Sequence, residues 1–519
     1  MADYRIGIDV GGTHTDAVIL DENDHVVAEV KTATTEDVTT GIERALNAVL
    51  KSASIDRARI QYAMLGTTHC TNAIVERKRL NRIAIVRIGA PATLAVEPLT
   101  GMPDDLKAMF SSHVLIAKGG HEFDGREIAP LDTESIYRFA ESLKGKIDAA
   151  AITSVFSPVS RHHEERAAAV FKDVFGEDFP VSLSHHIGSI GLLERENATI
   201  LNAALIGVAK QTVQGFEAAL RKEGVSARAF FGQNDGTLMS ADYAIQYPIF
   251  MIACGPTNSL RGASYLTELE DAVVVDVGGT TTDIGVIAKG FPRESAVSVE
   301  IGGVRTNFRM PDLVSVGIGG GTVVHIETDG RFALGPDSVG YRLTEKALVF
   351  GGDTLTFTDV AVALGRASIG DPARVKHLDR ALLETIYQTA VETIETAIDR
   401  MKVNDAFVPV ILTGGGSLLL PDDLKGASRV VRPAHYNVAN AIGAAIAQVS
   451  GEIERVYSLE KTPRSAALED AKRQAIANAI QAGARPDTCQ IVDVEDVPLA
   501  YLPGNATRIK VKAAGDLIG

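Results

Sequence analysis

Short apolar runs alternate with longer stretches of helical periodicity in the first part of the chain. Aliphatic and β-branched residues dominate Arg5–Val10, Ala17–Asp21 and Val26–Lys31, which predicts three successive strands. Apolar residues recur at helical spacing in Thr133–Leu143 and Arg161–Phe175, which predicts helices there. Strands that alternate with helices indicate a mixed sheet with helices packed on its faces.

The same pattern begins again after a long helix. Leu192–Arg221 contains no proline and carries apolar residues at helical spacing, so it predicts a helix that links two halves of the chain. Beyond it, apolar runs at Ala227–Phe231, Ile249–Ala253, Ala272–Val277 and Val408–Thr413 predict strands. At 519 residues the chain is too long for one ordinary core. The pattern therefore predicts a duplicated α/β unit.

Three segments follow from this pattern. Residues 1–187 are predicted to form an N-terminal lobe, residues 188–450 a second lobe, and residues 451–519 a small appendage of helix and strands. Each lobe contains a strand that ends in two adjacent glycines, and these glycines carry the first functional signal.

One motif occurs twice, once in each lobe. Asp9-Val10-Gly11-Gly12-Thr13-His14-Thr15-Asp16 returns as Asp276-Val277-Gly278-Gly279-Thr280-Thr281-Thr282-Asp283. Each copy lies between two apolar runs, which predicts a β-hairpin with a glycine and threonine tip. A single copy is equally consistent with an ordinary tight turn. Two copies with matching flanks indicate two hairpins that face a common phosphate chain.

The residue types of this motif suit a nucleotide. Adjacent glycines let backbone N–H groups converge on an anion without interference from a Cβ atom, and threonine hydroxyls add donors. Asp9 and Asp276 lie at strand ends, where a carboxylate can hold Mg²⁺ or its water, so they are the predicted catalytic and metal-binding residues. The predicted phosphate contacts are Gly11, Gly12, Thr13 and Thr15 on one side and Gly278, Gly279, Thr280, Thr281 and Thr282 on the other.

Two further glycine clusters follow the second copy of the motif. Gly414-Gly415-Gly416 comes directly after the predicted strand Val408–Thr413. A glycine triplet there lets a flat ring approach the backbone, so Gly414, Gly415 and Gly416 are the predicted adenosine-binding loop. Gly317–Thr322 is either a flexible surface loop or a loop that faces nucleotide or substrate.

A hydroxyl-rich segment, Gly66–Arg77, leads from a strand end into a helix. A helix N-terminus of this kind suits an anionic or carbonyl group, so Thr67, Thr68 and Asn72 are the predicted substrate contacts. The alternative is that Thr67 or Thr71 only caps the helix.

The histidines are predicted to be structural. His162-His163 and His185-His186 are adjacent pairs whose side chains point in different directions, and neither has the spacing of a helical ligand pair. A divalent-metal site built from His185, His186, His121 and Glu122 is the alternative that the sequence leaves open.

Composition narrows the class of protein. Hydrophobic residues make up 45% and charged residues 23%, as in a soluble globular protein, and no uncharged apolar run is long enough to span a membrane. A formal net charge of −15 without a basic stripe argues against nucleic-acid binding. Cys70, Cys254 and Cys489 share no metal-ligand spacing, so a reducing cytoplasm is the expected location.

The chain carries the first hairpin, the second hairpin and the glycine triplet in this order. The order resembles that of the superfamily of actin, the sugar kinases and the heat-shock chaperone ATPases. That resemblance implies a duplicated ribonuclease-H-like fold of the actin and hexokinase type, with mixed sheets and ATP in a cleft between two lobes. Six stretches together closely resemble the hydantoinase A/oxoprolinase family, in its short branch: Ile8–Val18, Gly66–Arg77, Glu194–Ala203, Val274–Val286, Met310–Gly321 and Leu334–Gly340.

The chain departs from the pattern of that family in three ways. His14 stands where members usually have an aromatic residue, and Cys254-Gly255-Pro256 stands where they have Ser-Gly-Pro. The chain is also shorter than the usual members. These departures concern the identity of the substrate more than the binding of ATP.

The resemblance implies an activity. It points to an ATP- and Mg²⁺-dependent hydrolase, or hydrolase subunit, that opens a cyclic amide such as a hydantoin, 5-oxoproline or a lactam after phosphoryl activation of the amide oxygen. A second hydantoinase-type subunit and an oligomer are expected as partners. The alternatives are a small-molecule kinase, an ATP-dependent carboxylase subunit, and a non-catalytic ATP-binding regulator or scaffold.

Overall fold

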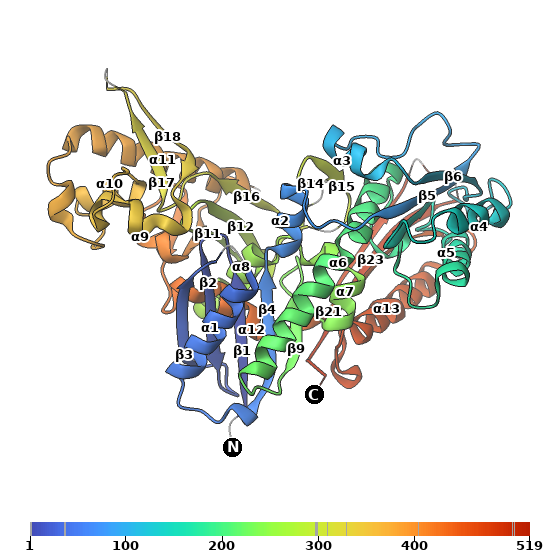
Figure 1. Ribbon diagram of the computed structural model, residues 1–519, viewed down its shortest axis with the longest axis horizontal. Coiled ribbons are helices and arrows are strands. Elements are labelled where there is room, and N and C mark those ends of the chain that lie inside the picture. The colour runs from blue at the N-terminus through green and yellow to red at the C-terminus, as the bar shows by residue number, and fades with distance from the viewer. Residues whose placement is uncertain are drawn as a thin grey trace.

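A computed structural model of the chain describes residues 3–35, 38–295, 299–308, 310–327, 330–402, 404–500, 502 and 504–518. Two large sheets and a smaller parallel sheet organise these residues (Figure 1). No helix among them is long and apolar enough to cross a lipid bilayer.

The larger sheet has nine strands in the order β22-β23-β21-β10-β9-β4-β1-β2-β3. Strands β1, β2 and β3 form an antiparallel meander, and β4 and β9 run parallel to β1. The bounds are β1 (Tyr4–Val10), β2 (His14–Leu20), β3 (Val26–Ala33), β4 (Ile60–Thr67), β9 (Arg228–Gly232), β10 (Leu238–Ser240), β21 (Val449–Ser458), β22 (Gln490–Pro498) and β23 (Ala506–Gly515).

Both faces of this sheet are buried in its N-terminal part, which explains the apolar runs there. Ala17 and Ile19 pack into the core on one face, and the alternating Val18 and Leu20 pack on the other. Helices α1 (Val38–Ser52) and α6 (Leu192–Lys222) cover the first face, and α12 (Ala439–Ile446) covers the second. The strands between them therefore carry apolar side chains on both faces.

The second sheet repeats the order of the first. Its six strands follow the order β13-β12-β11-β19-β20, and β16 also pairs with β12, which gives the path β16-β12-β11-β19-β20. Along that path β16, β12 and β11 are antiparallel, β19 is parallel to β11 and β20 is parallel to β19. The first sheet has the same arrangement in β3-β2-β1-β4-β9, so the predicted duplication is confirmed. The bounds are β11 (Ala272–Val277), β12 (Thr282–Ala288), β13 (Phe291–Pro292), β16 (Leu313–Val316), β19 (Val408–Thr413) and β20 (Ala427–Val431); α11 (Arg380–Met401) packs on this sheet.

Two helices cross between the lobes with their backbones in contact. A Cβ atom on Gly262 of α8 (Cys254–Thr267) would lie 1.8 Å from the carbonyl oxygen of Ala439 in α12, and one on Gly443 would lie 1.9 Å from that of Asn258. Only glycine permits this approach. Helix α8 also packs against β1 and β4 of one sheet and β11 and β12 of the other, and Figure 1 shows it between them.

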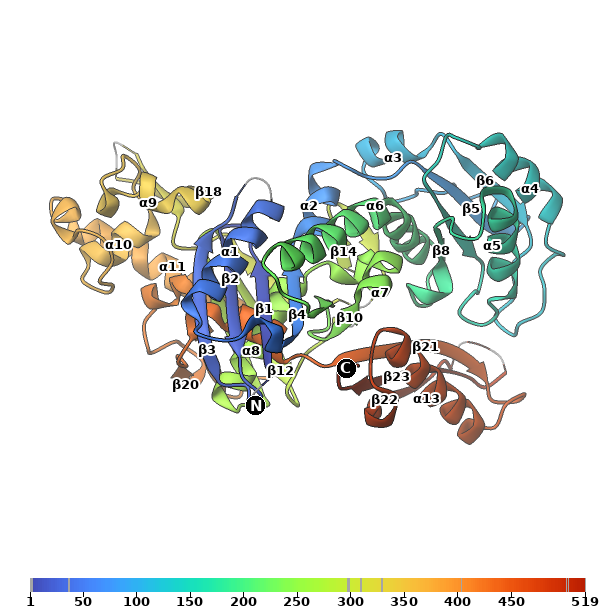
Figure 2. The ribbon, with the colours of Figure 1, turned by 60° about the horizontal axis from the view of Figure 1, so that its bottom comes forward.

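A separate parallel sheet is inserted between β4 and α6. Its order is β6-β5-β7-β8, and it has its own apolar core (Figure 2). A fully buried ion pair between Arg87 and Glu196 joins it to α6. The bounds are β5 (Ile83–Ala90), β6 (Val114–Lys118), β7 (Ala149–Ser154), β8 (Val181–Leu183), α3 (Asp104–Phe110), α4 (Thr133–Ser142) and α5 (His162–Phe175).

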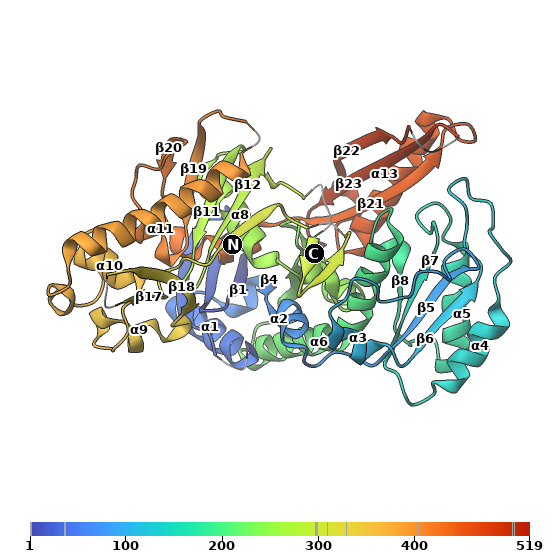
Figure 3. The same cartoon turned by 90° about the horizontal axis from the view of Figure 1, so that it is seen from above.

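The remaining elements are short, apart from one helix of the C-terminal segment. They are α2 (His69–Glu76), α7 (Ala241–Gln246), α9 (Leu343–Lys346), α10 (Phe357–Ala363), α13 (Arg464–Gln481), and the ribbons β14 (Val299–Ile301) with β15 (Val304–Thr306) and β17 (Thr322–Ile326) with β18 (Phe332–Ser338). Helix α13 packs on β21 and β23, and this C-terminal unit projects from the rest of the chain in Figure 3.

The nine-stranded sheet joins strands from all three predicted segments, 1–187, 188–450 and 451–519. Strand β9 lies beside β4, and β21 lies beside β10. The division into these segments stays a prediction. Strand β9 of the second segment is hydrogen-bonded to β4 of the first, and β21 itself contains the boundary between the second and third segments.

The strand predicted at Ile249–Ala253 is wrong. Residues Pro248–Met251 form a 3₁₀ helix, η3, whose side chains are all buried. A short apolar run does not distinguish a strand from a buried turn of helix, and Pro248 at the first position fixes a helical φ and lacks an N–H group for a sheet.

Candidate nucleotide site

The two repeated motifs form hairpins with the same turn. Asp9 pairs with Asp16 across the first hairpin, and Asp276 pairs with Asp283 across the second. The Gly11 N–H donates to the His14 carbonyl at 3.0 Å, and the Gly278 N–H donates to the Thr281 carbonyl at 2.9 Å. The two motifs therefore present the same backbone surface, one on each lobe.

The tips of the hairpins face each other. The hydroxyl oxygens of Thr13 and Thr280 are 3.4 Å apart, although 267 residues separate them. A Cβ atom on Gly279 would lie 2.8 Å from Thr13 Cγ2, whereas one on Gly12 would meet nothing within 4 Å. Gly279 is thus required for the close approach of the lobes, and Gly12 borders open space.

Helix α8 connects the two leading aspartates. Its Asn258 amide donates to Asp9 at 2.9 Å, and the next residue, Ser259, donates its hydroxyl to Asp276. Burial, reinforced by the Asp16 carboxylate, raises the pKa of Asp9 to about 6. Burial, reinforced by Asp283, likewise raises the pKa of Asp276 to about 6. A cation between the lobes would stabilise the charged form of both groups.

Asp16, which pairs with Asp9 across the first hairpin, has a lysine as its direct counter-charge. Both of its carboxylate oxygens accept from Lys31 Nζ, at 2.7 and 2.8 Å. The amide of Asn440, on α12, donates to Asp16 at 2.9 Å and to Asp9 at 3.0 Å. Two crossing helices therefore hold the aspartates of the first hairpin.

Thr15 and Thr282 do not face the other predicted phosphate contacts. Thr15 is fully buried beside Thr34, and Thr282 is fully buried and donates to the Ile318 carbonyl at 2.6 Å. Each pairs across its hairpin with a core valine, Val10 or Val277. Because side chains alternate along a strand, these threonines point to the core when the neighbouring aspartates point to the cleft. Their role as phosphate donors stays a prediction, and in this structure both side chains are buried.

Both further glycine clusters pack on the second hairpin. A Cβ atom on Gly414 would lie 2.3 Å from Asp276 Oδ1, and one on Gly416 would lie 2.7 Å from Val277 Cγ1. Gly415 is exposed beside Lys31. The Gly320 and Gly321 N–H groups donate to the carbonyls of Gly278 and Gly279, at 3.0 and 2.6 Å. These glycines hold the hairpin in place by direct backbone contact.

The predicted substrate contacts lie beside the first hairpin. Strand β4 runs parallel to β1 with Thr67 opposite Val10, so α2 begins next to the hairpin turn. The Thr67 hydroxyl contacts His69 Nδ1 at 2.9 Å and is buried, whereas Thr68 and Asn72 are partly exposed. Thr68 is the N-cap residue of α2 but its side chain makes no capping hydrogen bond.

The structure does not bring together His185, His186, His121 and Glu122. Within the described residues, the candidate metal group is His121, Glu127 and His163, whose ligand atoms lie within 4.8 Å of one another. His163 Nδ1 accepts from the Gly120 N–H at 3.0 Å, so the ring proton is on Nε2, which faces Glu127 at 3.1 Å. A protonated Nε2 has no lone pair for a metal, which argues against this group as a metal site.

Sequence reasoning missed Asn258, Ser259, Asn440 and Lys31. Asn440 is the one polar residue of the otherwise apolar helix α12, which is a signal that the sequence does contain. Asn258 and Ser259 lie in a polar run shortly after Gly255-Pro256, inside a helix whose other buried residues are mostly small or apolar. A buried amide needs partners, so each of these residues was a candidate for the site.

Two sheets of the same order, each carrying a glycine hairpin, define the class of protein: a duplicated ribonuclease-H-like fold of the actin and sugar-kinase type. The family follows from comparison with known proteins. The model of the hydantoinase/oxoprolinase N-terminal region matches residues 5–175, and the hydantoinase/oxoprolinase model matches residues 195–369. The chain belongs to the hydantoinase/oxoprolinase family.

Relatives within this group differ in reaction. The chain is 25% identical over 423 residues to caprolactamase subunit alpha of Pseudomonas jessenii and 26% identical over 436 residues to the acetophenone carboxylase gamma subunit of Aromatoleum aromaticum. These alignments cover 77% and 76% of this chain but only 60% and 58% of the relatives. The crystal structure of the ATP-dependent caprolactamase from P. jessenii shares the fold, with a TM-score of 0.77, 19% identity, and coverage of 98% of this chain and 87% of that one.

Proposed function

We propose that this chain binds ATP between its two hairpins and opens a cyclic amide, such as a hydantoin, 5-oxoproline or a lactam, by phosphoryl activation of the amide oxygen. One observation carries the proposal. Adjacent residues of α8, Asn258 and Ser259, hold the leading aspartates of two hairpins whose tips face each other. A phosphate chain between those tips would receive backbone N–H donors from both lobes.

The residues present fit ATP and Mg²⁺. Gly12 and Gly279 would supply backbone donors, because the N–H groups of Gly11 and Gly278 already donate within their hairpin turns. The hydroxyls of Thr13, Thr280 and Thr281 would add further donors. Asp9 and Asp276 would hold Mg²⁺ directly or through water, and the cation would favour their charged forms, which burial disfavours by raising the pKa of both. When bound, Mg²⁺ would neutralise charge on the phosphates. Gly414–Gly416 would lie against the adenosine, and Thr68 and Asn72 would face the substrate.

A thermal-shift measurement tests the nucleotide site. A ligand that binds only the folded state adds about 2.7 kcal/mol at a hundredfold excess over its dissociation constant, so ATP with Mg²⁺ should raise the melting temperature. Gly279→Val should abolish the shift, because a side chain there would force Thr13 and the opposite hairpin apart. An unshifted wild-type protein, or a full shift in a cooperatively folding Gly279→Val variant, would contradict the proposal.

An ATPase screen tests the reaction. Hydantoin, 5-oxoproline and caprolactam should each be assayed with Mg²⁺ for ATP hydrolysis and for the ring-opened product. Coupled ATP hydrolysis and ring opening supports the proposal, with a second hydantoinase-type subunit added if the chain alone is inactive. Accumulation of a phosphorylated product would instead indicate a kinase.

A carboxylase subunit is the second candidate. The comparable similarity to the acetophenone carboxylase gamma subunit favours it. The same screen with bicarbonate and a ketone distinguishes the two, because a carboxylase would hydrolyse ATP only when both are present and would form a carboxylated product.

A further inference from the structure

Three side chains form a row across the first sheet. Asp9 of β1 lies opposite Asp16 of β2, and Asp16 lies opposite Lys31 of β3. Residues that lie directly opposite on neighbouring antiparallel strands place their side chains on the same face of the sheet. We call Asp9, Asp16 and Lys31 the first row. The register of the strands therefore fixes the lysine beside Asp16.

The duplication produces the same row in the second sheet, with one difference. Asp276 of β11 lies opposite Asp283 of β12, and Asp283 lies opposite Ser315 of β16. Because β16 corresponds to β3 in the order of the strands, Ser315 takes the place of Lys31 (Figure 1). We call Asp276, Asp283 and Ser315 the second row. It combines two carboxylates with a hydroxyl, whereas the first row combines two carboxylates with an ammonium group.

Lys31 holds both carboxylate oxygens of Asp16. Its Nζ donates to them at 2.7 and 2.8 Å, and to the Asn437 carbonyl at 3.0 Å. The side chain of Asp16 is 3% exposed and that of Lys31 is 26% exposed, so water screens this pair only in part. One nitrogen of Asn440 donates to both Asp16 and Asp9, which places the two carboxylates close together. A divalent cation between them would bind against the charge of Lys31.

The second row has neutral hydrogen-bond donors. Ser259 donates to Asp276 and Ser315 donates to Asp283, and no lysine or arginine forms an ion pair with either carboxylate within the described part of the chain. Burial, reinforced by the Asp283 carboxylate, raises the pKa of Asp276, and burial raises the pKa of Asp283. A divalent cation would stabilise both charges, and carboxylate oxygens are the ligands that Mg²⁺ and Mn²⁺ prefer.

We propose that Lys31 excludes the divalent cation from Asp16 and thereby assigns it to the second row, with Asp276 and Asp283 as its carboxylate ligands. This rests on the proposed function, which places Mg²⁺ beside ATP. It adds Asp283 to the residues that hold the cation and leaves Asp9 to act through water. Asp16 and Asp283 occupy equivalent positions of the repeated motif, so the residue that distinguishes them is the lysine on β3 or the serine on β16.

Binding of Mn²⁺, followed by the EPR signal of the free ion, tests the proposal on the full chain without nucleotide. Asp283→Asn should weaken Mn²⁺ binding by about tenfold or more, because a charged ligand is lost. The matched control is the double variant Lys31→Met and Asp16→Asn, which replaces the ion pair by neutral side chains and should change the affinity by less than about threefold. An equal or larger loss in the double variant, or no Mn²⁺ binding by the wild type at millimolar Mn²⁺, would overturn the proposal.

Lys31→Met alone should change the affinities of two ligands in opposite directions. The charge of Lys31 lowers the pKa of both Asp9 and Asp276, so its removal makes the potential at both rows more negative. At pH 8, Mn²⁺ should bind more tightly and metal-free ATP, measured in EDTA, should bind more weakly, each by about threefold or more. Lys31→Arg, which keeps the charge, should restore both affinities. A purely structural role would weaken both ligands, and that result would overturn the role of Lys31.

Paramagnetic broadening locates the ion in the wild-type protein. Val30 precedes Lys31 on β3 and Val314 precedes Ser315 on β16, so the two valines occupy equivalent positions in the two lobes. In protein with ¹³C-labelled valine methyl groups, Mn²⁺ should broaden the Val314 signals at lower concentration than the Val30 signals, and Val30→Ala and Val314→Ala identify them. Equal broadening or the reverse order would overturn the assignment. The thermal shift with ATP tests the nucleotide site separately, so a failure here is distinguishable from a failure of the proposed function.

Discussion

Four aspartates gather where the two hairpins meet, and their surroundings differ. Asp16 has Lys31 as a direct counter-charge, and Asp283 has a hydrogen bond from Ser315. Asp9 and Asp276 have the neutral partners Asn258, Asn440 and Ser259 as their hydrogen-bond donors. A divalent cation would therefore act most strongly on Asp9 and Asp276.

Substituting the two leading aspartates should affect turnover more than nucleotide affinity. Asp9→Asn and Asp276→Asn keep the size of the side chain but remove a charge beside the proposed metal, whereas the hairpin N–H groups should still bind phosphate. We expect kcat to fall at least a hundredfold, and more for Asp9→Asn, with little change in KM for ATP. Wild-type turnover in both variants would show that the hairpins are only structural turns.

The three cysteines should differ in reactivity. Burial raises the pKa of the Cys70 and Cys254 thiols to about 12, so at pH 8 they hold almost no thiolate. Cys489 is partly exposed. Labelling of the native protein with iodoacetamide at pH 8 should modify Cys489 alone, and all three only after unfolding. Fast modification of Cys254 in the native state would contradict its buried position beside Thr67.

At the scale of elements, α8 is the part that makes the two hairpins one site. It packs on both sheets, crosses α12 at two glycines, and presents consecutive polar residues to the two aspartates. A helix keeps neighbouring side chains about 100° apart, so Asn258 and Ser259 can reach different strands from one turn. A shift of α8 would change both aspartates together.

Removing one contact of α8 should move a pH profile. The Ser259 hydroxyl lowers the pKa of Asp276, so Ser259→Ala should raise that pKa further. If the reaction requires the carboxylate, activity is lost as pH falls through this pKa, and the acid limb of the kcat/KM profile should move to higher pH. Ser264→Ala is the matched control, because that hydroxyl bonds to the Leu269 carbonyl near the other end of α8. An equal shift in both variants would exclude a local effect on Asp276.

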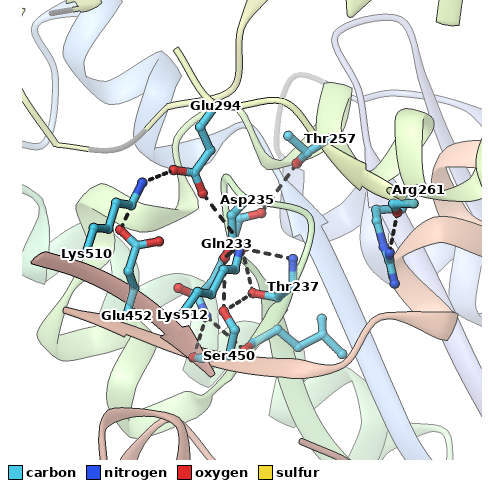
Figure 4. Close-up of polar contacts among 12 residues, drawn as sticks. Gln233, Asp235, Thr237, Thr257, Arg261, Glu294, Ser450, Glu452, Lys510 and Lys512 are labelled. Atoms are coloured by element: carbon cyan, nitrogen blue, oxygen red, sulfur yellow. Dashed lines mark hydrogen bonds and ion pairs between the residues drawn. The ribbon is translucent and has the colours of Figure 1, made fainter. Parts of the chain in front are cut away.

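At the scale of the whole molecule, the C-terminal segment is part of the main sheet. Strand β21 pairs with β10, and Lys512 of β23 pairs with the buried Asp235 at 2.8 Å (Figure 4). Asp235 also accepts from the hydroxyls of Thr237 and Ser450. Its charge is compensated by a residue 277 positions later, so the last strands stabilise the turn that follows β9.

Breaking this ion pair should be costly. Lys512→Met leaves Asp235 as a buried charge without its nearest cation, which typically costs about 3–5 kcal/mol of unfolding free energy. Lys472→Met is the control, because its pair with Glu469 is at the surface and should contribute less than about 1 kcal/mol. Denaturant unfolding of both variants measures the difference, and equal stabilities would show that Asp235 is adequately solvated or paired without Lys512.

The sequence determined the local features of this protein, because each depends on residues that are close along the chain. Repeated Asp, Gly and Thr positions predicted both hairpins, and apolar periodicity predicted most strands and the duplicated fold. Tertiary structure decided what faces the site. Asn258 and Asn440 reach Asp9 from 249 and 431 residues away, and no local pattern encodes such a pairing. Thr15 and Thr282 face the core because strand pairing and burial determine which face of the sheet each side chain takes. The run at Ile249–Ala253 begins in a buried 3₁₀ turn because apolar character specifies burial, whereas packing specifies geometry.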